Sequence, residues 1–275
     1  MGGGLLDFQA RWIKHQRDGQ EMDGYLVGPP RVSHPLPAVL VIQEIWGPDE
    51  HIQDMARRFA EAGYVALAPD LYSRGGRPEK LSAASIERLK TFMDTLPPGS
   101  WHDQDVLKEH MTRRPADEAE ALQATMGALF GPRDMAGMAQ DLVAWMDYLR
   151  DAPETRGMPV GSIGYCMGGA LSFQLATMGT RLATALVYYG SAPDESQLGA
   201  VSCPVYGFYG GQDPRITEAV PGVAKKLAEL GKRFEHHVYP DAPHAFFNDS
   251  RSSYHVDAAR DAWARSLHAL RQHLS

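Results

Sequence analysis

The 275-residue sequence lacks several features that whole classes of protein require. It has two cysteines, too few for a disulfide framework. No apolar run approaches the roughly 18 residues that a transmembrane helix needs. The N-terminus has neither the basic segment nor the long apolar core of a signal peptide, and Leu6 breaks the myristoylation pattern that begins at Gly2. We therefore expect a protein of the cytoplasm.

Basic charge is also in short supply, since 27 basic and 34 acidic residues leave a net charge of −7. This balance disfavours nucleic acid and anionic membranes as partners, although a local pocket could still hold a negatively charged small molecule. No paired histidines or cysteines stand at metal-ligand spacing, and no phosphate-binding loop is evident, so the sequence predicts no metal and no cofactor. The oligomeric state, monomer or homodimer, is left open.

What is present is an alternation of strand and helix patterns. Residues 8–15 and 21–28 flank an Asp-Gly turn signal and predict an antiparallel hairpin. The apolar run 38–42 is typical of a strand buried on both faces of a parallel sheet. Residues 134–150 carry apolar side chains at steps of three and four and predict a helix. The alternation predicts a doubly wound, mostly parallel sheet in a single α/β domain of residues 1–275.

The alternation is interrupted after the strand predicted at residues 64–68. Residues 75–133 contain three helical stretches separated by prolines, and a plain strand–helix–strand connection needs far fewer residues. Because α/β folds build ligand sites at the carboxyl ends of their strands, we expect this insertion to act as a cap over the site. Decorative packing is the alternative.

The segment around which the chain is organised is residues 158–180. A predicted strand is followed by a predicted helix, and Gly-Tyr-Cys-Met-Gly (164–168) stands between them. So sharp a reversal strains the backbone of Cys166 and leaves no room for side chains two positions away. The thiol would be lifted toward the helix N-terminus, where free N–H groups favour an anion. Glycine-rich turns also occur in dinucleotide-binding proteins and as plain packing, so the motif alone does not identify the chemistry.

A cysteine nucleophile needs a base, and the base needs an acid that fixes its tautomer. Asp213 and His244 each follow a predicted strand, and the carboxyl ends of parallel strands share one edge of a sheet, so we expect both beside Cys166. The order nucleophile, acid, histidine is that of α/β-hydrolases. Asp213 could instead cap the following helix, and Asp241 is a rival acid that is more typical of a turn.

Acyl transfer also needs two N–H donors for the tetrahedral oxyanion. We expect the backbone N–H of Met167, which the turn would fix, to be one of them. The other is expected from Ile45, in the loop that follows the strand 38–42.

Six short segments together resemble the dienelactone hydrolase (carboxymethylenebutenolidase) family. They run in the family's order across nearly the whole chain from Val39 onward. They are Gln-Glu-Ile-Trp-Gly (43–47), Pro-Asp-Leu-Tyr (69–72), Gly-Tyr-Cys-Met-Gly-Gly (164–169), Tyr-Tyr-Gly (188–190), Gly-Gly-Gln-Asp (210–213) and Pro-His-Ala-Phe (243–246).

The resemblance implies an α/β-hydrolase fold and a hydrolase that cleaves a lactone or ester through a covalent thioester. In that scheme Cys166 is the nucleophile, His244 the base and Asp213 its orienter. Glu44 matches a glutamate that pairs with the resting thiol and is displaced by substrate, which fits the need to protect a thiolate from oxidation. The alternative for Glu44 is a buried structural acid paired with an arginine.

The sequence departs from the family where substrate would bind. Members that act on dienelactone hold its carboxylate with arginines, one of them a few residues beyond the catalytic histidine. Here residues 246–249 are Phe-Phe-Asn-Asp, Arg251 comes later, and the insertion is longer than in compact members. The candidates for substrate contact are Arg74, Arg77, Tyr72, Trp46 and Phe246.

Two rival functions remain. A generic carboxylesterase or thioesterase for neutral substrates is favoured by the aromatic pair Phe246 and Phe247. A binding or redox-sensing protein of the same fold would use Cys166 as a reactive thiol without turnover. Cys203, just before a predicted strand, is expected to be structural.

Overall fold

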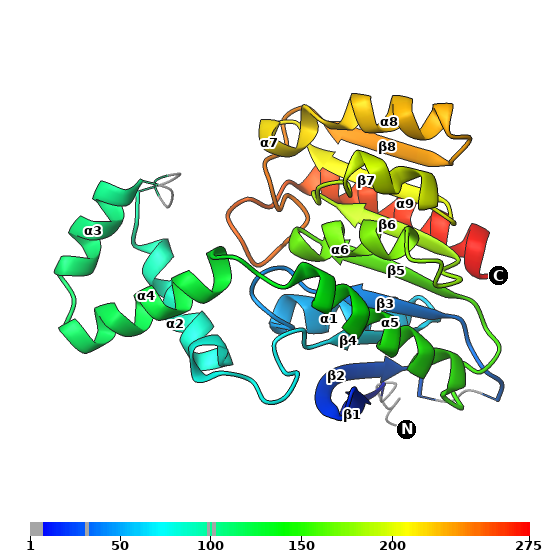
Figure 1. The fold of residues 1–275 in the computed structure, drawn as a ribbon, viewed down its shortest axis with the longest axis horizontal. Coiled ribbons are helices and arrows are strands. Elements are labelled where there is room, and N and C mark those ends of the chain that lie inside the picture. Colours follow the sequence, from blue (N-terminus) through cyan, green and yellow to red (C-terminus); the bar gives the residue numbers. More distant parts are fainter. Residues whose placement is uncertain (1–7, 31–32, 98–99, 101–102) are drawn as a thin grey trace, which may run out of the picture. The chain divides into compact units, whose positions relative to one another are not determined.

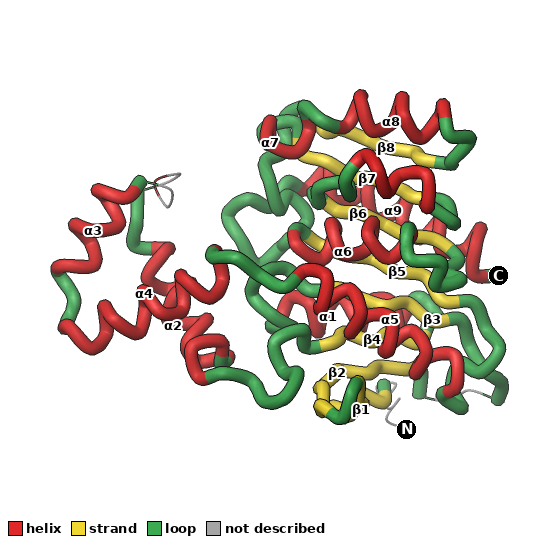
Figure 2. The backbone as a smooth tube through the Cα atoms, viewed as in Figure 1, coloured by secondary structure: helices red, strands yellow, loops and turns green. Residues whose placement is uncertain are grey.

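The computed structural model describes residues 8–30, 33–97, 100 and 103–275. The chain forms two compact units, of which the first comprises the residues up to Leu71 and from Met135 onward. The second unit is Tyr72–Asp134. Strands occur in the first unit and helices in both, as Figures 1 and 2 show.

Eight strands of the described residues form one sheet in the order β1-β2-β4-β3-β5-β6-β7-β8 (Figure 1). β2 pairs antiparallel with both β1 and β4, and the other neighbours are parallel. The strands are β1 (Gln9–Arg17), β2 (Gln20–Gly28), β3 (Ala38–Ile42), β4 (Val65–Pro69), β5 (Val160–Tyr165), β6 (Thr184–Tyr188), β7 (Val205–Gly210) and β8 (Phe234–Tyr239). The predicted sheet with its N-terminal antiparallel hairpin is confirmed.

The hairpin turns at the predicted Asp-Gly pair. Asp18 and Gly19 both have positive φ, 51° and 73°, which is the backbone that a tight two-residue hairpin turn requires. The paired strands extend to Arg17 and Gln20, closer to the turn than the hydrophobic pattern indicated. Pairing continues because backbone hydrogen bonds do not depend on which side chains are apolar.

Helices cover both faces of the sheet, with α9 behind it and α5, α6 and α8 in front in Figure 1. Val39, Val41 and Ile163 share one buried cluster with residues of α1 and α9. On the other face, the Ser162 hydroxyl of β5 bonds that of Ser172 in α6 at 2.8 Å. The helices of this unit are α1 (Glu50–Glu61), α5 (Met135–Asp151), α6 (Met167–Ala176), α7 (Pro214–Thr217), α8 (Val220–Glu229), α9 (Val256–Leu274) and the short 3₁₀ helix η3 (Glu195–Ala200).

The parallel strands end at a common edge, where the connecting loops gather (Figure 2). Ile42 of β3 pairs with Gly164 of β5, and Tyr165 pairs with Tyr188 of β6. At the far side of the sheet, Gly210 of β7 pairs with Tyr239 of β8. The loops that carry the predicted site residues therefore begin at corresponding levels of neighbouring strands.

The second unit consists of α2 (Ala83–Asp94), α3 (Gln104–Thr112), α4 (Ala116–Phe130) and the 3₁₀ helix η1 (Glu79–Leu81). Both α2 and α3 pack on α4. Ser82 caps α2 by accepting the Ser85 N–H at 3.1 Å, and the Arg114 guanidinium lies 5.5 Å from the ring centre of Phe92. The three predicted helical stretches are thus present, while the role of this unit as a cap stays a prediction. Among the described residues, no helix combines the length and apolar composition needed to cross a membrane.

Candidate active site

Cys166 lies at the turn between β5 and α6, in the left-handed region at φ 53° and ψ −114°. A non-glycine residue adopts this backbone only when its surroundings enforce it. The Cys166 N–H donates to the Tyr188 carbonyl at 3.0 Å, which ties the turn to the end of β6. α6 begins at Met167, two residues before the start that the sequence predicted, because Gly168 and Gly169 form its first turn.

The glycines around Cys166 are required because backbone segments meet there without room for a side chain. A Cβ at Gly164 would lie 1.8 Å from the Gly168 carbonyl oxygen. A Cβ at Gly168 would lie 2.3 Å from the Ile42 carbonyl oxygen, at the end of β3. Real Cβ contacts are essentially never shorter than 3.0 Å. The predicted steric reason for glycine on both sides of Cys166 is therefore present in the structure.

Asp213 and His244 come together in the loops after β7 and β8. The Nδ1 atom of His244 lies 2.5 Å from Oδ2 of Asp213, whose side chain is buried. Asp213 is also the residue that precedes α7, but its side chain makes no capping hydrogen bond there. The carboxylate of Asp213 therefore does not act as a helix cap. Asp241, the rival acid, is exposed.

The pKa values of this pair shift in opposite directions. Burial alone would lower the pKa of His244, but the hydrogen bond to Asp213 and the interaction with Cys166 outweigh it and raise the pKa to about 10. Burial alone would raise the pKa of Asp213, but the hydrogen bond to His244 lowers it. The pair therefore favours an imidazolium beside a carboxylate.

Glu44 is buried, with 3% of its surface exposed, and follows β3 at the same edge. The Tyr189 hydroxyl donates to its Oε1 at 3.2 Å, and the Asn248 amide donates to its Oε2 at 2.9 Å. The alternative in which an arginine pairs with Glu44 is wrong, because both partners are neutral. Pairing between Glu44 and the Cys166 thiol stays a prediction.

Tyr189 and Asn248 are site residues that the sequence did not single out. Tyr189 follows β6 with φ 40°, and its ring centre lies 5.1 Å from that of His244. Asn248 stands four residues after His244 and is 1% exposed. The available signal was position alone, because Tyr189 lies within the recognised segment 188–190 and Asn248 stands two residues after the recognised segment 243–246.

The structure contradicts one of the predicted substrate contacts and leaves the others as predictions. Phe246 is wrong as a contact, because its side chain is fully buried and packs against Tyr188, Tyr189 and Tyr239. The same burial removes Phe247 as an argument for a neutral substrate. Trp46 is largely buried after β3, with the Arg251 guanidinium 5.1 Å from its ring centre. Tyr72, Arg74 and Arg77 belong to the second unit and stay predictions, as do the oxyanion donors Met167 and Ile45.

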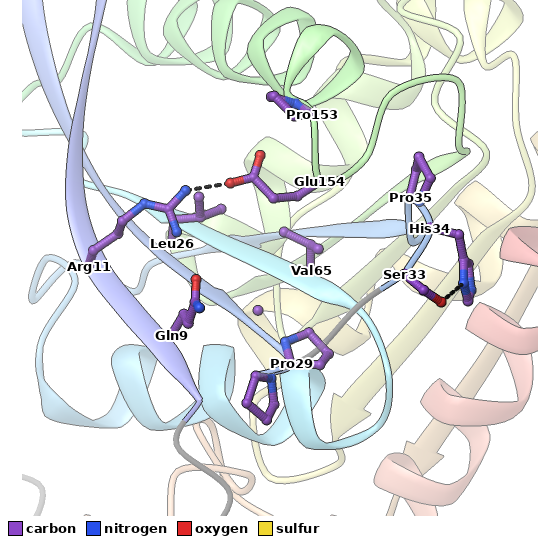
Figure 3. Close-up of a pocket in the computed structure, with 12 residues that line it drawn as sticks. Gln9, Arg11, Leu26, Pro29, Ser33, His34, Pro35, Val65, Pro153 and Glu154 are labelled. Carbon is purple, nitrogen blue, oxygen red and sulfur yellow. Dashed lines mark hydrogen bonds and ion pairs between the residues drawn. The ribbon is translucent and has the colours of Figure 1, made fainter.

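A separate pocket of about 830 Å³ opens beside the N-terminal hairpin (Figure 3). The Arg11–Glu154 ion pair, 2.5 Å long, lies in its wall, and Val65 at the start of β4 lines it. This places the pocket at the end of the strands away from Cys166, and it contains no predicted site residue. In the part of the chain that the structure describes, no three His, Cys, Asp or Glu side chains converge as metal ligands would.

Residues 22–274 match the model of the Dienelactone hydrolase family. The protein named "Putative carboxymethylenebutenolidase" of Saccharolobus solfataricus is 33% identical over 261 residues, which cover 94% of this chain and 97% of that protein. A protein of the same name from Escherichia coli K12 is 30% identical, with 93% and 84% covered. The crystal structure of a "Putative Dienelactone Hydrolase" from Klebsiella pneumoniae aligns with a TM-score of 0.71 at 27% identity, covering 96% of this chain and 99% of that one.

The tight turn at Cys166 predicts that adding one methyl group at Gly164 strongly destabilises the fold. We expect Gly164→Ala to lower the free energy of unfolding by about 3 kcal/mol or more, since the new Cβ meets backbone that cannot move aside. Gly199→Ala is the matched control, because a Cβ there has nothing within 4 Å. Urea unfolding measures both. A loss below about 1 kcal/mol for Gly164→Ala would contradict the steric argument.

The His244–Asp213 pair predicts a pH dependence. The folded-state pKa of about 10 exceeds the ordinary value of 6.5, so the charged imidazole stabilises the fold fully below pH 6.5, and this contribution is lost as the pH rises toward 10. Asp213→Asn should lower the pKa of His244 and so reduce the loss of folding stability between pH 6.5 and 10. NMR titration of labelled histidine, with His244→Gln to assign the signal, checks this. If the pKa of His244 were the same in Asp213→Asn as in the wild type, the Asp213 carboxylate would not be the cause of the raised pKa.

Proposed function

The chain belongs to the dienelactone hydrolase family, and from this premise we propose that it hydrolyses a lactone or ester by nucleophilic catalysis at Cys166. The observation that carries the proposal is the juxtaposition of three groups from separate loops. A strained turn presents the Cys166 thiol, His244 interacts with it, and Asp213 lies 2.5 Å from Nδ1 of His244. This juxtaposition supports the roles of nucleophile for Cys166, base for His244 and orienting acid for Asp213.

The first step makes the thiolate. Because Nδ1 of His244 faces Asp213, Nε2 is the nitrogen left to take the proton from Sγ of Cys166. The raised pKa of His244 keeps that proton on the ring. A thiolate beside the N-terminus of α6 is further favoured by the helix dipole.

The second step forms the acyl-enzyme. Sγ attacks the carbonyl carbon, and the electron pair moves to the carbonyl oxygen, which the N–H groups of Met167 and Ile45 would hold. When the tetrahedral intermediate collapses, the bond to the alcohol oxygen breaks and the His244 imidazolium protonates that oxygen. The product is a thioester on Cys166 with the alcohol released, or still attached to the acyl group in a lactone.

The third step hydrolyses the thioester and regenerates the free enzyme. His244, now neutral, takes a proton from water as the water oxygen attacks the thioester carbonyl. Collapse breaks the carbon–sulfur bond, releases the carboxylic acid and leaves the Cys166 thiolate beside the His244 imidazolium, which is the state that the first step produced. The cycle needs no cofactor, and its substrate is a small lactone or ester.

Glu44 has a regulatory place in this scheme. Its carboxylate would disfavour the thiolate in the resting enzyme and be displaced when substrate binds, so the reactive thiolate forms only when needed. Burial and the hydrogen bonds from Tyr189 and Asn248 support this role, because they hold a charged group at the edge that carries Cys166.

Removing the nucleophile tests the whole proposal. Cys166→Ala should abolish turnover of activated esters and lactones, because no other group takes the attacking role, while the circular dichroism spectrum stays that of the wild type. Cys203→Ala is the matched control and should retain activity, since burial raises the pKa of the Cys203 thiol to about 12. Wild-type turnover in Cys166→Ala would refute the assignment, and mass spectrometry should find the acyl adduct on Cys166 alone.

Neutralising Glu44 tests the gating role. Glu44→Gln should raise the rate at which iodoacetamide alkylates Cys166 at pH 7 several-fold, because a charge that opposes the thiolate is removed. The comparison variant is Glu61→Gln, an exposed acid at the end of α1. An equal or slower alkylation rate in Glu44→Gln would count against the gating role without affecting the nucleophile.

A further inference from the structure

The register of the central strands brings Glu44 and Cys166 to the same edge of the sheet. Ile42 pairs with Gly164, so Glu44 and Cys166 each stand two residues beyond paired positions on neighbouring strands. The close approach continues past the strands, because a Cβ at Gly168 would lie 2.5 Å from the Gln43 carbonyl oxygen. Tyr189 links the two groups, since it bonds Glu44 and its pKa responds to the charges of both Glu44 and Cys166.

The two side chains that hold Glu44 are uncharged donors. Oδ1 of Asn248 accepts the Ser250 N–H at 3.1 Å and lies 2.6 Å from the Ser250 hydroxyl, which turns the Asn248 amide nitrogen toward Glu44. Burial, with the nearby charge of Glu44, raises the pKa of Tyr189 well above its ordinary value, so its hydroxyl keeps its proton and donates it. Hydrogen bonds of this kind position a carboxylate but leave its full charge in place.

Three cationic side chains from the loops at this edge have partners other than Glu44. His244 pairs with Asp213, and Arg215 lies 3.6 Å from the same carboxylate. Arg251, three residues beyond Asn248, stacks on the Trp46 ring. In the described ranges, no lysine or arginine nitrogen lies within 4.0 Å of a Glu44 oxygen, whose side-chain hydrogen bonds come from Tyr189 and Asn248.

We propose that Asn248 is a specificity-determining residue: by holding Glu44 with a neutral amide, it leaves an uncompensated negative charge beside Cys166 and makes the site select neutral acyl groups over anionic ones. The inference rests on the proposed function, because it names the substrate class of Cys166. An anionic acyl group would approach a buried like charge, where repulsion is screened far less than in water. A neutral acyl group meets no such barrier.

A pair of alkylating reagents of nearly equal size tests the charge selection without requiring turnover. Iodoacetate is anionic and iodoacetamide is neutral, and we expect both to alkylate Cys166, while the buried Cys203 is protected by its raised pKa. The quantity measured is the ratio of the iodoacetate rate to the iodoacetamide rate. His244 is the same in every variant, so changes in this ratio report on Glu44 and Asn248.

We expect Asn248→Lys to raise the ratio roughly fivefold or more, because its ammonium compensates Glu44. Glu44→Gln should raise it similarly, and Asn248→Asp, which adds a second negative charge, should lower it. Asn248→Leu removes the hydrogen bond without adding charge and should leave the ratio within about twofold of wild type. Ser252→Lys is the matched control, since it places the same charge at an exposed position of the same loop.

Equal ratios in Asn248→Lys and Ser252→Lys, with an unchanged ratio in Glu44→Gln, would overturn the proposal. A shift in Asn248→Leu as large as that in Asn248→Lys would also overturn it, because the effect would then come from lost packing. If Asn248→Lys does not fold, the ratio of alkylation rates in Glu44→Gln decides the test.

Ester hydrolysis then separates this inference from the proposed function. Wild-type enzyme should have a higher kcat/KM for 4-nitrophenyl hexanoate than for mono(4-nitrophenyl) adipate, and Asn248→Lys should narrow the difference. Shifted alkylation ratios with no Cys166-dependent hydrolysis of either ester would refute the function and keep the charge selection. Hydrolysis with a wild-type preference for the adipate ester would refute the charge selection and keep the function.

Discussion

The close approach of α6 to the ends of β3 and β5 is the constraint on which the site depends. The carbonyl groups of Ile42 and Gly168 occupy the space that side chains at residues 168 and 164 would need, and Cys166 can leave the strand only through a left-handed turn. That turn gives the thiol its position beside the helix N-terminus. Because the turn is bonded to Tyr188, the geometry at Cys166 is set by three strands together and not by a flexible loop.

The charges around the nucleophile are arranged by two separate sets of hydrogen bonds. Asp213 stabilises the charged form of His244, which favours transfer of a proton to the ring. Tyr189 and Asn248 hold Glu44 with neutral donors at the edge of the sheet that carries Cys166. The loop after β8 supplies both His244 and Asn248, so one segment of chain carries the proposed base and one of the two hydrogen-bond donors to Glu44.

Much of the fold followed from the sequence because its signals are local. Alternating strand and helix patterns, the Asp-Gly turn and glycine on each side of Cys166 report the backbone directly, and the structure confirms the elements that they predicted. The prediction for Phe246 was wrong because exposure is not a local property. A phenylalanine after a catalytic histidine is equally compatible with a pocket wall and with the core. Three tyrosines at the ends of β6 and β8 pack against Phe246 and bury it in the core.

The sequence by itself determined the type of sheet, the family and the candidates for nucleophile, base and acid, because each depends on residue type and order along the chain. Only the tertiary structure decided which partners Glu44 has. Glu44 bonds Tyr189 and Asn248, which lie 145 and 204 positions away in the sequence. The hydrophobic periodicity of a sequence carries no information on contacts between residues so far apart. They exist because strands β3, β6 and β8 end at one edge of the sheet, which brings distant loops within hydrogen-bonding distance.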